Sequence, residues 1–256
     1  MSYKCALNIP DCHIPWHDPK AWRVMLTVAQ DFEAKIQKFD EINICGDFCD
    51  FFWFSLHPKM PEMMSIKDTL KDEISCARKM LAELRELFPS ATINFIEGNH
   101  EYRMLRYIIN KCPELFDMFS VPELLNLQSL GIRFFPFGRN QLFSCCGTNY
   151  YLRHQPYNGG KHCAATSIAN KHISIGFGHT HRIQSYVTTD ALGNEIEAHS
   201  MGWLGDPEAA IFAYMDHDTW AQGFQIFHAF SQEDWHVENV RIKNGTAIYN
   251  GVKYVG

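Results

Sequence analysis

Five short segments carry acidic, amide and imidazole side chains that could bind a metal ion. They are Asp11-Cys12-His13, Gly46-Asp47, Gly98-Asn99-His100-Glu101, Arg153-His154 and Gly178-His179-Thr180-His181. Carboxylate, amide and imidazole groups are good ligands for Mn, Fe and Zn. An ion held by such groups can activate a water molecule for hydrolysis. The segments therefore predict metal-assisted chemistry.

The spacing within these segments favours a shared site. Residues i and i+2 of an extended strand point to the same side, so Asp11 and His13 can meet while the residue between them faces away. His179 and His181 have the same spacing. Asp47 could bridge two ions with its two carboxylate oxygens. Any one pair arises often by chance, whereas an ordered set of five segments does not.

The third segment contains two further polar residues with different expected uses. Asn99 offers a neutral carbonyl oxygen to a metal ion. Glu101 is expected to start a helix, where its charge suits the helix dipole. Gly46, Gly98 and Gly178 each precede a candidate ligand, where a sharp turn or a close approach of the backbone is wanted.

The elements that must position these segments alternate between strand and helix in the first hundred residues. Strands are predicted over 3–9, 41–45 and 91–96. Asp18 and Pro19 predict the start of one helix. Ser65 and Asp68 resemble a capping box that starts a second, and a third is expected over 101–110. This alternation predicts a parallel sheet, and ligands of such sheets bind beyond the carboxyl ends of the strands.

The second half of the chain reads mainly as short strands. They are predicted over 132–135, 141–144, 149–153 and 172–177, with a helix over 163–170. After Ile183 the pattern is nearly all strand, including a hairpin at Lys243-Asn244-Gly245. A mixed α/β sandwich with two sheets accommodates both halves, and we expect one domain over 1–256.

Composition limits the partners and the compartment. The 256 residues carry a formal net charge of −6, and nothing in that total demands a nucleic-acid-binding face. The nine cysteines include no CxxC pair, so we expect reduced thiols in a cytoplasm rather than disulfides or a structural zinc site. No signal peptide or membrane span is expected. The sequence does not indicate an oligomeric state.

Taken together, the five segments resemble the motifs of the calcineurin-like metallophosphoesterases, in particular small single-domain members of bacterial and phage type. That family carries DxH, GDxxD, GNH[DE], a later histidine and GHxH, in this order. The matching positions here are Asp11/His13, Gly46-Asp47-Phe48-Cys49-Asp50, Gly98-Asn99-His100-Glu101, His154 and Gly178-His179-Thr180-His181. The resemblance covers residues 11–181 of the 256.

The resemblance implies a centre with two divalent metal ions. One ion would be held by Asp11, His13, Asp47 and His181, and the other by Asp47, Asn99, His154 and His179. Mn is the expected ion, with Fe, Ni or Zn as alternatives. A hydroxide bridging the ions would attack phosphorus, His100 would act as the general acid, and Asp50 would orient His100. The implied fold is a four-layer αββα sandwich with two mixed β-sheets.

The chain departs from the family pattern at two places. The phosphate-binding arginine of the phosphoprotein phosphatases is missing after Asp50, which disfavours a protein Ser/Thr phosphatase. Arg103 is the expected replacement, with Asn99 as a second candidate contact to the substrate. Arg153 stands where many members have a glycine before the histidine of the fourth motif.

The resemblance implies hydrolysis of a phosphate ester, either a phosphodiester or a phosphomonoester. The partner would be that ester, which a nucleotide or a nucleic acid could supply. A nuclease acting on DNA or RNA ends or single strands and a non-catalytic metal-binding scaffold stay open as alternatives. The aromatic segment Phe51–Phe54 and Trp203 are expected either to be buried or to form an apolar wall at the site.

Overall fold

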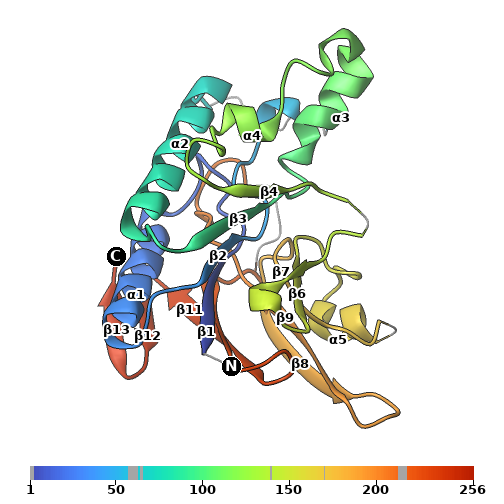
Figure 1. Cartoon of the computed structure of the whole chain (residues 1–256). Helices are drawn as coiled ribbons and strands as arrows, with labels where there is room; N and C mark the ends of the chain where they lie inside the picture. Colours follow the sequence, from blue (N-terminus) through green and yellow to red (C-terminus); the bar gives the residue numbers. More distant parts are fainter. Residues whose placement is uncertain (1–2, 57–62, 64–65, 139, 170, 213–217) are drawn as a thin grey trace.

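The computed structural model describes residues 3–56, 63, 66–138, 140–169, 171–212 and 218–256. The larger of its two sheets has eight strands in the order β13-β12-β11-β10-β1-β2-β3-β4 (Figure 1). Their bounds are β1 Lys4–Ile9, β2 Glu41–Ile44, β3 Thr92–Ile96, β4 Arg133–Phe135, β10 Gly223–Ala229, β11 Trp235–Lys243, β12 Thr246–Tyr249 and β13 Val252–Val255. Strands β1 to β4 are parallel, and β10 pairs antiparallel with β1, so this sheet is mixed.

The second sheet has five strands in the order β5-β6-β7-β9-β8. Their bounds are β5 Phe143–Ser144, β6 Tyr150–Arg153, β7 Ser174–Phe177, β8 Ile183–Thr189 and β9 Glu195–Met201. This sheet is also mixed, because β6, β7 and β9 run parallel while β5 and β8 pair antiparallel with their neighbours. The expected α/β chain with two mixed sheets is therefore confirmed.

Five α-helices and three short 3₁₀ turns connect the described strands. Their bounds are α1 Pro19–Lys35, α2 Leu70–Leu87, α3 Tyr102–Lys111, α4 Val121–Leu124, α5 Cys163–Ile168, η1 Phe52–Phe54, η3 Pro113–Leu115 and η4 Cys145–Gly147.

Asp18 caps α1 as predicted. The prediction that α2 begins at Ser65 was wrong, although Ser65 itself lies outside the described residues. The capping box is formed by Thr69 and Asp72, whose side chains each accept a backbone N–H of the other residue.

Apolar side chains pack on both faces of the large sheet. On one face, Trp22 and Phe32 of α1 and Leu81 of α2 join the strand side chains in one core. On the other face, Tyr150 and Met201 of the second sheet belong to a separate core cluster with residues of the first. Helix α5 covers the far side of the second sheet through contacts with β8 and β9. In the part of the chain that the structure describes, no helix combines the length and apolar character that crossing a bilayer requires.

A ladder of five amide side chains, four of them buried, crosses the large sheet on the side that faces the second sheet. Its members are Asn94, Asn43, Asn8, Gln225 and Asn239, one from each of five neighbouring strands and each directly opposite the next. Four side-chain hydrogen bonds of 2.8, 2.9, 2.8 and 3.1 Å link them in that order. Because a slip of one residue would turn an amide into the apolar core, the ladder specifies the strand register.

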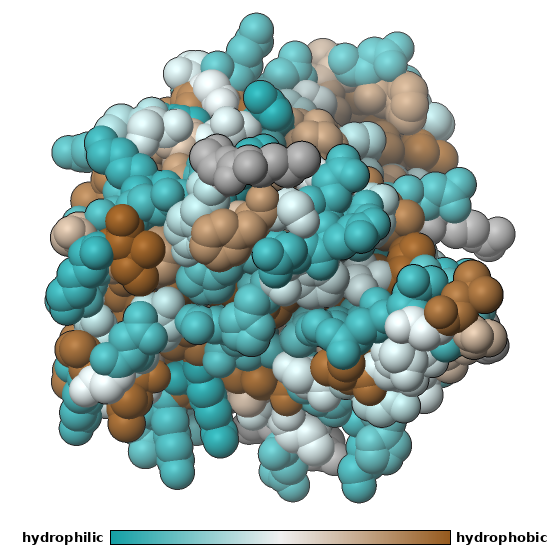
Figure 2. Space-filling view, turned by 60° about the horizontal axis from the view of Figure 1, so that its bottom comes forward, coloured by the Kyte–Doolittle hydropathy of each residue, from teal (hydrophilic) through white to brown (hydrophobic). Residues whose placement is uncertain are grey.

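The strands that precede the five polar segments all end on one side of the molecule. Strands β1, β2 and β3 are parallel neighbours in the large sheet, and β6 and β7 are parallel neighbours in the small one. The loops after these strands therefore converge from two sheets. The opposite end of the molecule, near the N-terminus, is mostly hydrophilic, with apolar side chains scattered among polar ones (Figure 2).

Candidate metal centre

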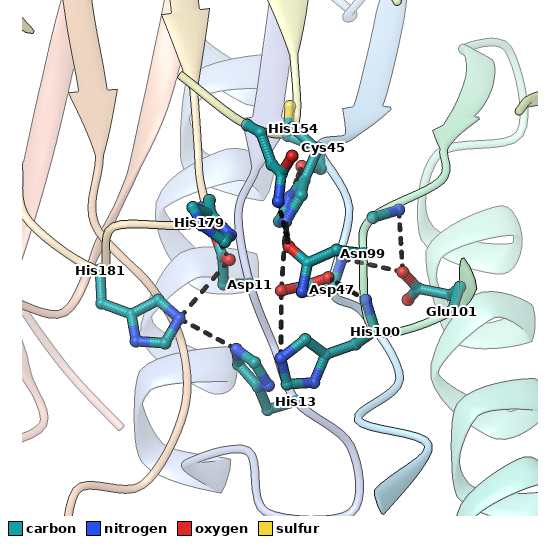
Figure 3. A network of polar contacts seen from close by, with 12 residues as sticks. Asp11, His13, Cys45, Asp47, Asn99, His100, Glu101, His154, His179 and His181 are labelled. Atoms are coloured by element: carbon teal, nitrogen blue, oxygen red, sulfur yellow. Dashed lines mark hydrogen bonds and ion pairs between the residues drawn. The ribbon is translucent and has the colours of Figure 1, made fainter. Parts of the chain in front are cut away.

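Asp11, His13 and His181 come together beyond the ends of β1 and β7. Each offers one ligand atom, and these atoms lie within 4.8 Å of one another. The Nε2 atoms of His13 and His181 are 3.0 Å apart, and Nε2 of His181 is 3.6 Å from Oδ1 of Asp11 (Figure 3). All three residues are buried. The first predicted ligand set is therefore assembled, apart from Asp47, which belongs to a second group.

Asp47, His154 and His179 form that second group, again with ligand atoms within 4.8 Å. Nε2 of His154 lies 3.1 Å from Oδ2 of Asp47 and 2.9 Å from Oδ1 of Asn99. The backbone N–H of His179 donates to the Asp11 carboxylate at 2.8 Å, which ties the two groups together. The structure thus brings together all seven predicted metal ligands (Figure 3).

Four of these residues have a left-handed backbone. The φ angle is 52° at His13, 48° at Asp47, 63° at His179 and 55° at His181. The expectation that extended strand geometry aligns residues i and i+2 was therefore wrong, because the ligands lie on turns beyond the strand ends. Such strain in non-glycine residues persists only where the surrounding structure enforces it, and it clusters at functional sites.

All three glycines that precede ligands allow close contact within the centre. A Cβ atom on Gly46, where φ is 89°, would lie 2.4 Å from Nδ1 of His154. A Cβ atom on Gly178 would lie 2.1 Å from Oδ2 of Asp11. A Cβ atom on Gly98 would lie 2.2 Å from both the backbone nitrogen and Oδ1 of Asp47. Any larger residue at Gly98 or Gly178 would push the carboxylates apart, so the prediction of a close backbone approach is confirmed there.

Asp50 positions two imidazole rings at once. Its Oδ2 atom lies 2.9 Å from Nδ1 of His13 and 3.1 Å from Nδ1 of His100. The contact to His13 turns the Nε2 atom of that ring toward His181, as an outer carboxylate does for a metal-binding histidine. Arg103 contacts both Asp50 and His100. Its Nη1 atom lies 3.3 Å from Oδ1 of Asp50, and its Nη2 atom lies 2.8 Å from Nε2 of His100. Arg103 is therefore beside the centre, as predicted.

Glu101 has a role that the sequence did not indicate. It is fully buried, and its carboxylate accepts the backbone N–H groups of Asp47, Cys49 and Gly98 at 3.0, 2.8 and 2.9 Å. Burial and the nearby Asp47 carboxylate raise the pKa of Glu101 to about 8, against the effect of these donors. Glu101 thus joins the loops after β2 and β3, rather than only starting α3. The acidic residue that ends the third motif, Gly98-Asn99-His100-Glu101, was the available signal.

An aromatic cluster packs beside the first group of ligands. The ring of Trp203 is stacked on His181 with centroids 4.8 Å apart and planes 11° apart. Phe52 is buried in the same cluster, whereas Trp53 is 42% exposed. We expected Phe51–Phe54 and Trp203 either to be buried or to form an apolar wall at the site. Both expectations apply in part, because Trp203 is buried and also forms a wall of the site.

The electrostatics of the centre suit a bound cation. Burial, together with the neighbouring His154, lowers the pKa of His179 to about 4. Burial also lowers the pKa of His181, to about 3. Burial opposes protonation of His154 too, but the carboxylates of Asp47 and Asp11 raise its pKa to about 9. Neutral imidazoles and ionised carboxylates are the forms that bind divalent ions, so the donor types fit such ions once His154 has lost its proton.

No known protein-family pattern matches the chain, and no curated protein shows detectable sequence similarity to it. The resemblance to the calcineurin-like metallophosphoesterases depends on the five motifs alone.

Proposed function

We propose that this protein is a phosphoesterase of the calcineurin-like type that uses two divalent metal ions. The observation that carries the proposal is the meeting of two ligand groups, buried except for the half-buried His179, which are joined by the contact between His179 and Asp11. The order of helix, sheet, sheet and helix seen in the packing of α1, the two sheets and α5 supports the four-layer αββα arrangement of that family. Mn is the ion we expect, with Fe, Ni or Zn as alternatives.

The two groups divide the ligands between two ions. Asp11, His13 and His181 would hold one ion, and Asn99, His154 and His179 would hold the other. Asp47 would contribute to both. When bound, the ions would lower the pKa of a shared water molecule and polarise the phosphoryl oxygens of the ester.

The chain's own contribution to bond cleavage is the placement of His100 and Arg103. Burial lowers the pKa of His100, but the Asp47 and Asp50 carboxylates have the larger, opposite effect, so this pKa lies above its ordinary value. Its Nε2 atom is 3.6 Å from Oδ2 of Asp47, so this edge of the ring faces the centre. His100 is therefore placed to protonate the leaving oxygen, a role that is worth roughly 10²–10⁴ in rate.

The cysteines agree with a reducing compartment, which we propose is the cytoplasm. All nine are free, and seven of them are buried. Disulfides are rare where glutathione and thioredoxin keep thiols reduced.

Metal analysis combined with a substrate panel tests the proposed function. The panel contains p-nitrophenyl phosphate, bis-p-nitrophenyl phosphate, alkyl phosphates, cyclic nucleotides, and single- and double-stranded DNA. We expect about two ions per chain and metal-dependent turnover of one class of ester. His100→Ala should retain the ions and lose more activity with alkyl than with p-nitrophenyl esters. A protein that binds two ions and cleaves nothing would support the scaffold alternative, and cleavage of DNA alone would support the nuclease.

A further inference from the structure

A second cluster of potential metal ligands lies at the other end of β2. Glu41 begins this strand, whereas Asp47 follows its far end. Cys145 and Cys146 belong to the 3₁₀ turn η4, which connects β5 to β6. One ligand atom from each of Glu41, Cys145 and Cys146 lies within 4.8 Å of the other two. The cluster is therefore separate from the centre described above.

Short contacts hold the two cysteines beside the carboxylate. The backbone N–H of Cys146 donates to Oε2 of Glu41 at 2.9 Å, and the Nδ2 atom of Asn43 lies 3.5 Å from the same oxygen. Cys146 has a left-handed backbone, with φ 52° and ψ 21°, which interrupts the helical turn between the two thiols. Cys145 is completely buried, and Asn43 also approaches its sulfur at 3.6 Å.

A pocket adjoins this cluster at Cys146, which is the one of the three residues that lines it, together with Lys4 and Thr148. Lys4 donates to the carbonyl oxygen of Cys146 at 3.2 Å. Lys4 and Arg133 both act electrostatically on Glu41 and favour its ionised form, although burial raises the pKa of Glu41 overall.

We propose that Glu41, Cys145 and Cys146 form a second metal site that takes a single thiophilic ion such as Zn²⁺ or Cd²⁺. Two thiolates and one carboxylate supply three ligands, and the adjoining pocket leaves the fourth position to water or a small ligand. These three ligands carry three negative charges, of which a divalent ion offsets two. One negative charge remains, and either Lys4 or Arg133, which both act on Glu41, is sufficient to offset it.

The two sites differ in the ions they select. The centre at the strand ends has only nitrogen and oxygen donors, which suit Mn and Fe as well as Zn. Thiolates select softer ions, so the site at Glu41 should discriminate against Mn. Because the two sites share no ligand, the second site does not depend on the proposed phosphoesterase activity.

Ultraviolet titration with Cd²⁺ tests this second site. Cd²⁺ bound to thiolates gives a charge-transfer absorption, whereas Cd²⁺ bound to imidazole and carboxylate ligands does not, so the first centre is silent. We expect the reduced protein to gain this absorption, with one thiolate-bound Cd²⁺ per chain. Cys146→Ser should halve its intensity and weaken binding by more than about tenfold, because even outer contacts of a metal site are worth that much.

Two further variants keep the result interpretable if the cysteine change impairs folding. Glu41→Gln should preserve the absorption while weakening Cd²⁺ binding, and Cys112→Ser, which changes a remote thiol, should leave both unchanged. The proposal is overturned if the reduced protein shows no thiolate absorption with Cd²⁺, or if Cys146→Ser leaves that absorption intact. It is also overturned if the two thiols form a disulfide in air but take no Cd²⁺ when reduced.

Discussion

The Nη2 atom of Arg103 lies 2.8 Å from the Nε2 atom of His100. Because a guanidinium can only donate, the histidine must accept at Nε2 and carry its proton on Nδ1, where it faces Asp50. For His100 to donate a proton from Nε2, Arg103 must release this contact. A phosphoryl oxygen of the substrate is a suitable new acceptor for the guanidinium.

Arg103→Ala should therefore lower kcat/KM by roughly 10², since the loss of one donor to the developing charge costs about that much. Metal content should not change, because the side chain of Arg103 bonds to Asp50 and His100, and neither residue is a predicted metal ligand. Arg106→Ala is the matched control, since this exposed arginine lies one helical turn further along α3. Equal losses in the two variants would contradict a specific role for Arg103.

Asp47→Asn should weaken binding at both ligand groups and abolish activity. The substitution removes the one carboxylate assigned to both ions, and we expect metal affinity to fall more than about 100-fold, because outer contacts alone cost 10–100-fold. Equilibrium dialysis with Mn²⁺ measures this loss. Asp50→Asn serves as the comparison, since it removes only an outer contact to His13 and should weaken metal binding by about 10–100-fold, less than Asp47→Asn does. A turnover-competent Asp47→Asn protein with two bound ions would refute the assignment.

Glu101→Gln should impair both stability and metal binding, although Glu101 is not a predicted metal ligand. The amide group of glutamine cannot accept all three backbone N–H groups that Glu101 accepts, and one unsatisfied buried group costs about 1–3 kcal/mol. Urea unfolding of the metal-free protein gives the change in the free energy of unfolding. The exposed Glu86→Gln variant is the control, and indistinguishable midpoints for the two variants would exclude this positioning role.

The raised pKa of His154 makes metal binding depend on pH. In the metal-free protein this pKa is about 9, compared with 6.5 for an ordinary histidine, so an incoming ion must displace a proton at neutral pH. Affinity should rise with pH up to about 9, by roughly tenfold per pH unit for one proton. Calorimetry in buffers of different ionisation enthalpy measures the released proton. His154→Asn should lose this dependence, and an equal slope in the variant would contradict it.

The raised pKa of His154 also makes the stability of the metal-free protein depend on pH. Metal affinity should rise with pH, whereas this contribution to stability should fall. A pKa raised in the folded state stabilises the protein fully below the unfolded value of 6.5, and this contribution is lost as the pH rises through about 9. Other groups titrate over the same range. The comparison that isolates His154 is therefore the difference between the parent protein and His154→Asn across that window.

Asn43→Ala tests the amide ladder. Asn43 donates to Asn8 and accepts from Asn94, so its removal takes one hydrogen-bond partner from each of two buried amide groups. We expect a loss of about 1–3 kcal/mol in the free energy of unfolding for each of them. Asn110→Ala, at an exposed position on α3, is the control. If both variants unfold at the same urea concentration, the ladder does not stabilise this register.

The sequence predicted the alternating elements and the meeting of the motifs because both depend on local patterns. Asp18 and Pro19 mark the start of α1, and Asn244 and Gly245 mark the hairpin between β11 and β12, where both have positive φ. The start of α2 was predicted too early, because Ser65 and Thr69 each precede an acidic residue at capping-box spacing. Only the contacts of Thr69 show which one is used.

Long-range contacts were the part that local patterns could not reveal. Glu101 bonds to backbone groups 52 and 54 residues away, and Asp50 contacts a histidine ring 37 residues away. The stacking of Trp203 on His181 likewise needs the two sheets to be in place. Such partners follow from packing rather than from spacing. This is why the predicted ligands met while their supporting residues were incompletely identified.

Anomalous diffraction from crystals soaked in Mn²⁺ tests the central claim most directly. We expect two peaks about 3.5–4 Å apart, the separation found in two-metal hydrolytic sites. One peak should lie beside Asp11, His13 and His181, the other beside Asn99, His154 and His179, and Asp47 should lie between them. A single peak, or the absence of density at these side chains when the crystals contain excess Mn²⁺, would contradict the proposed dinuclear centre.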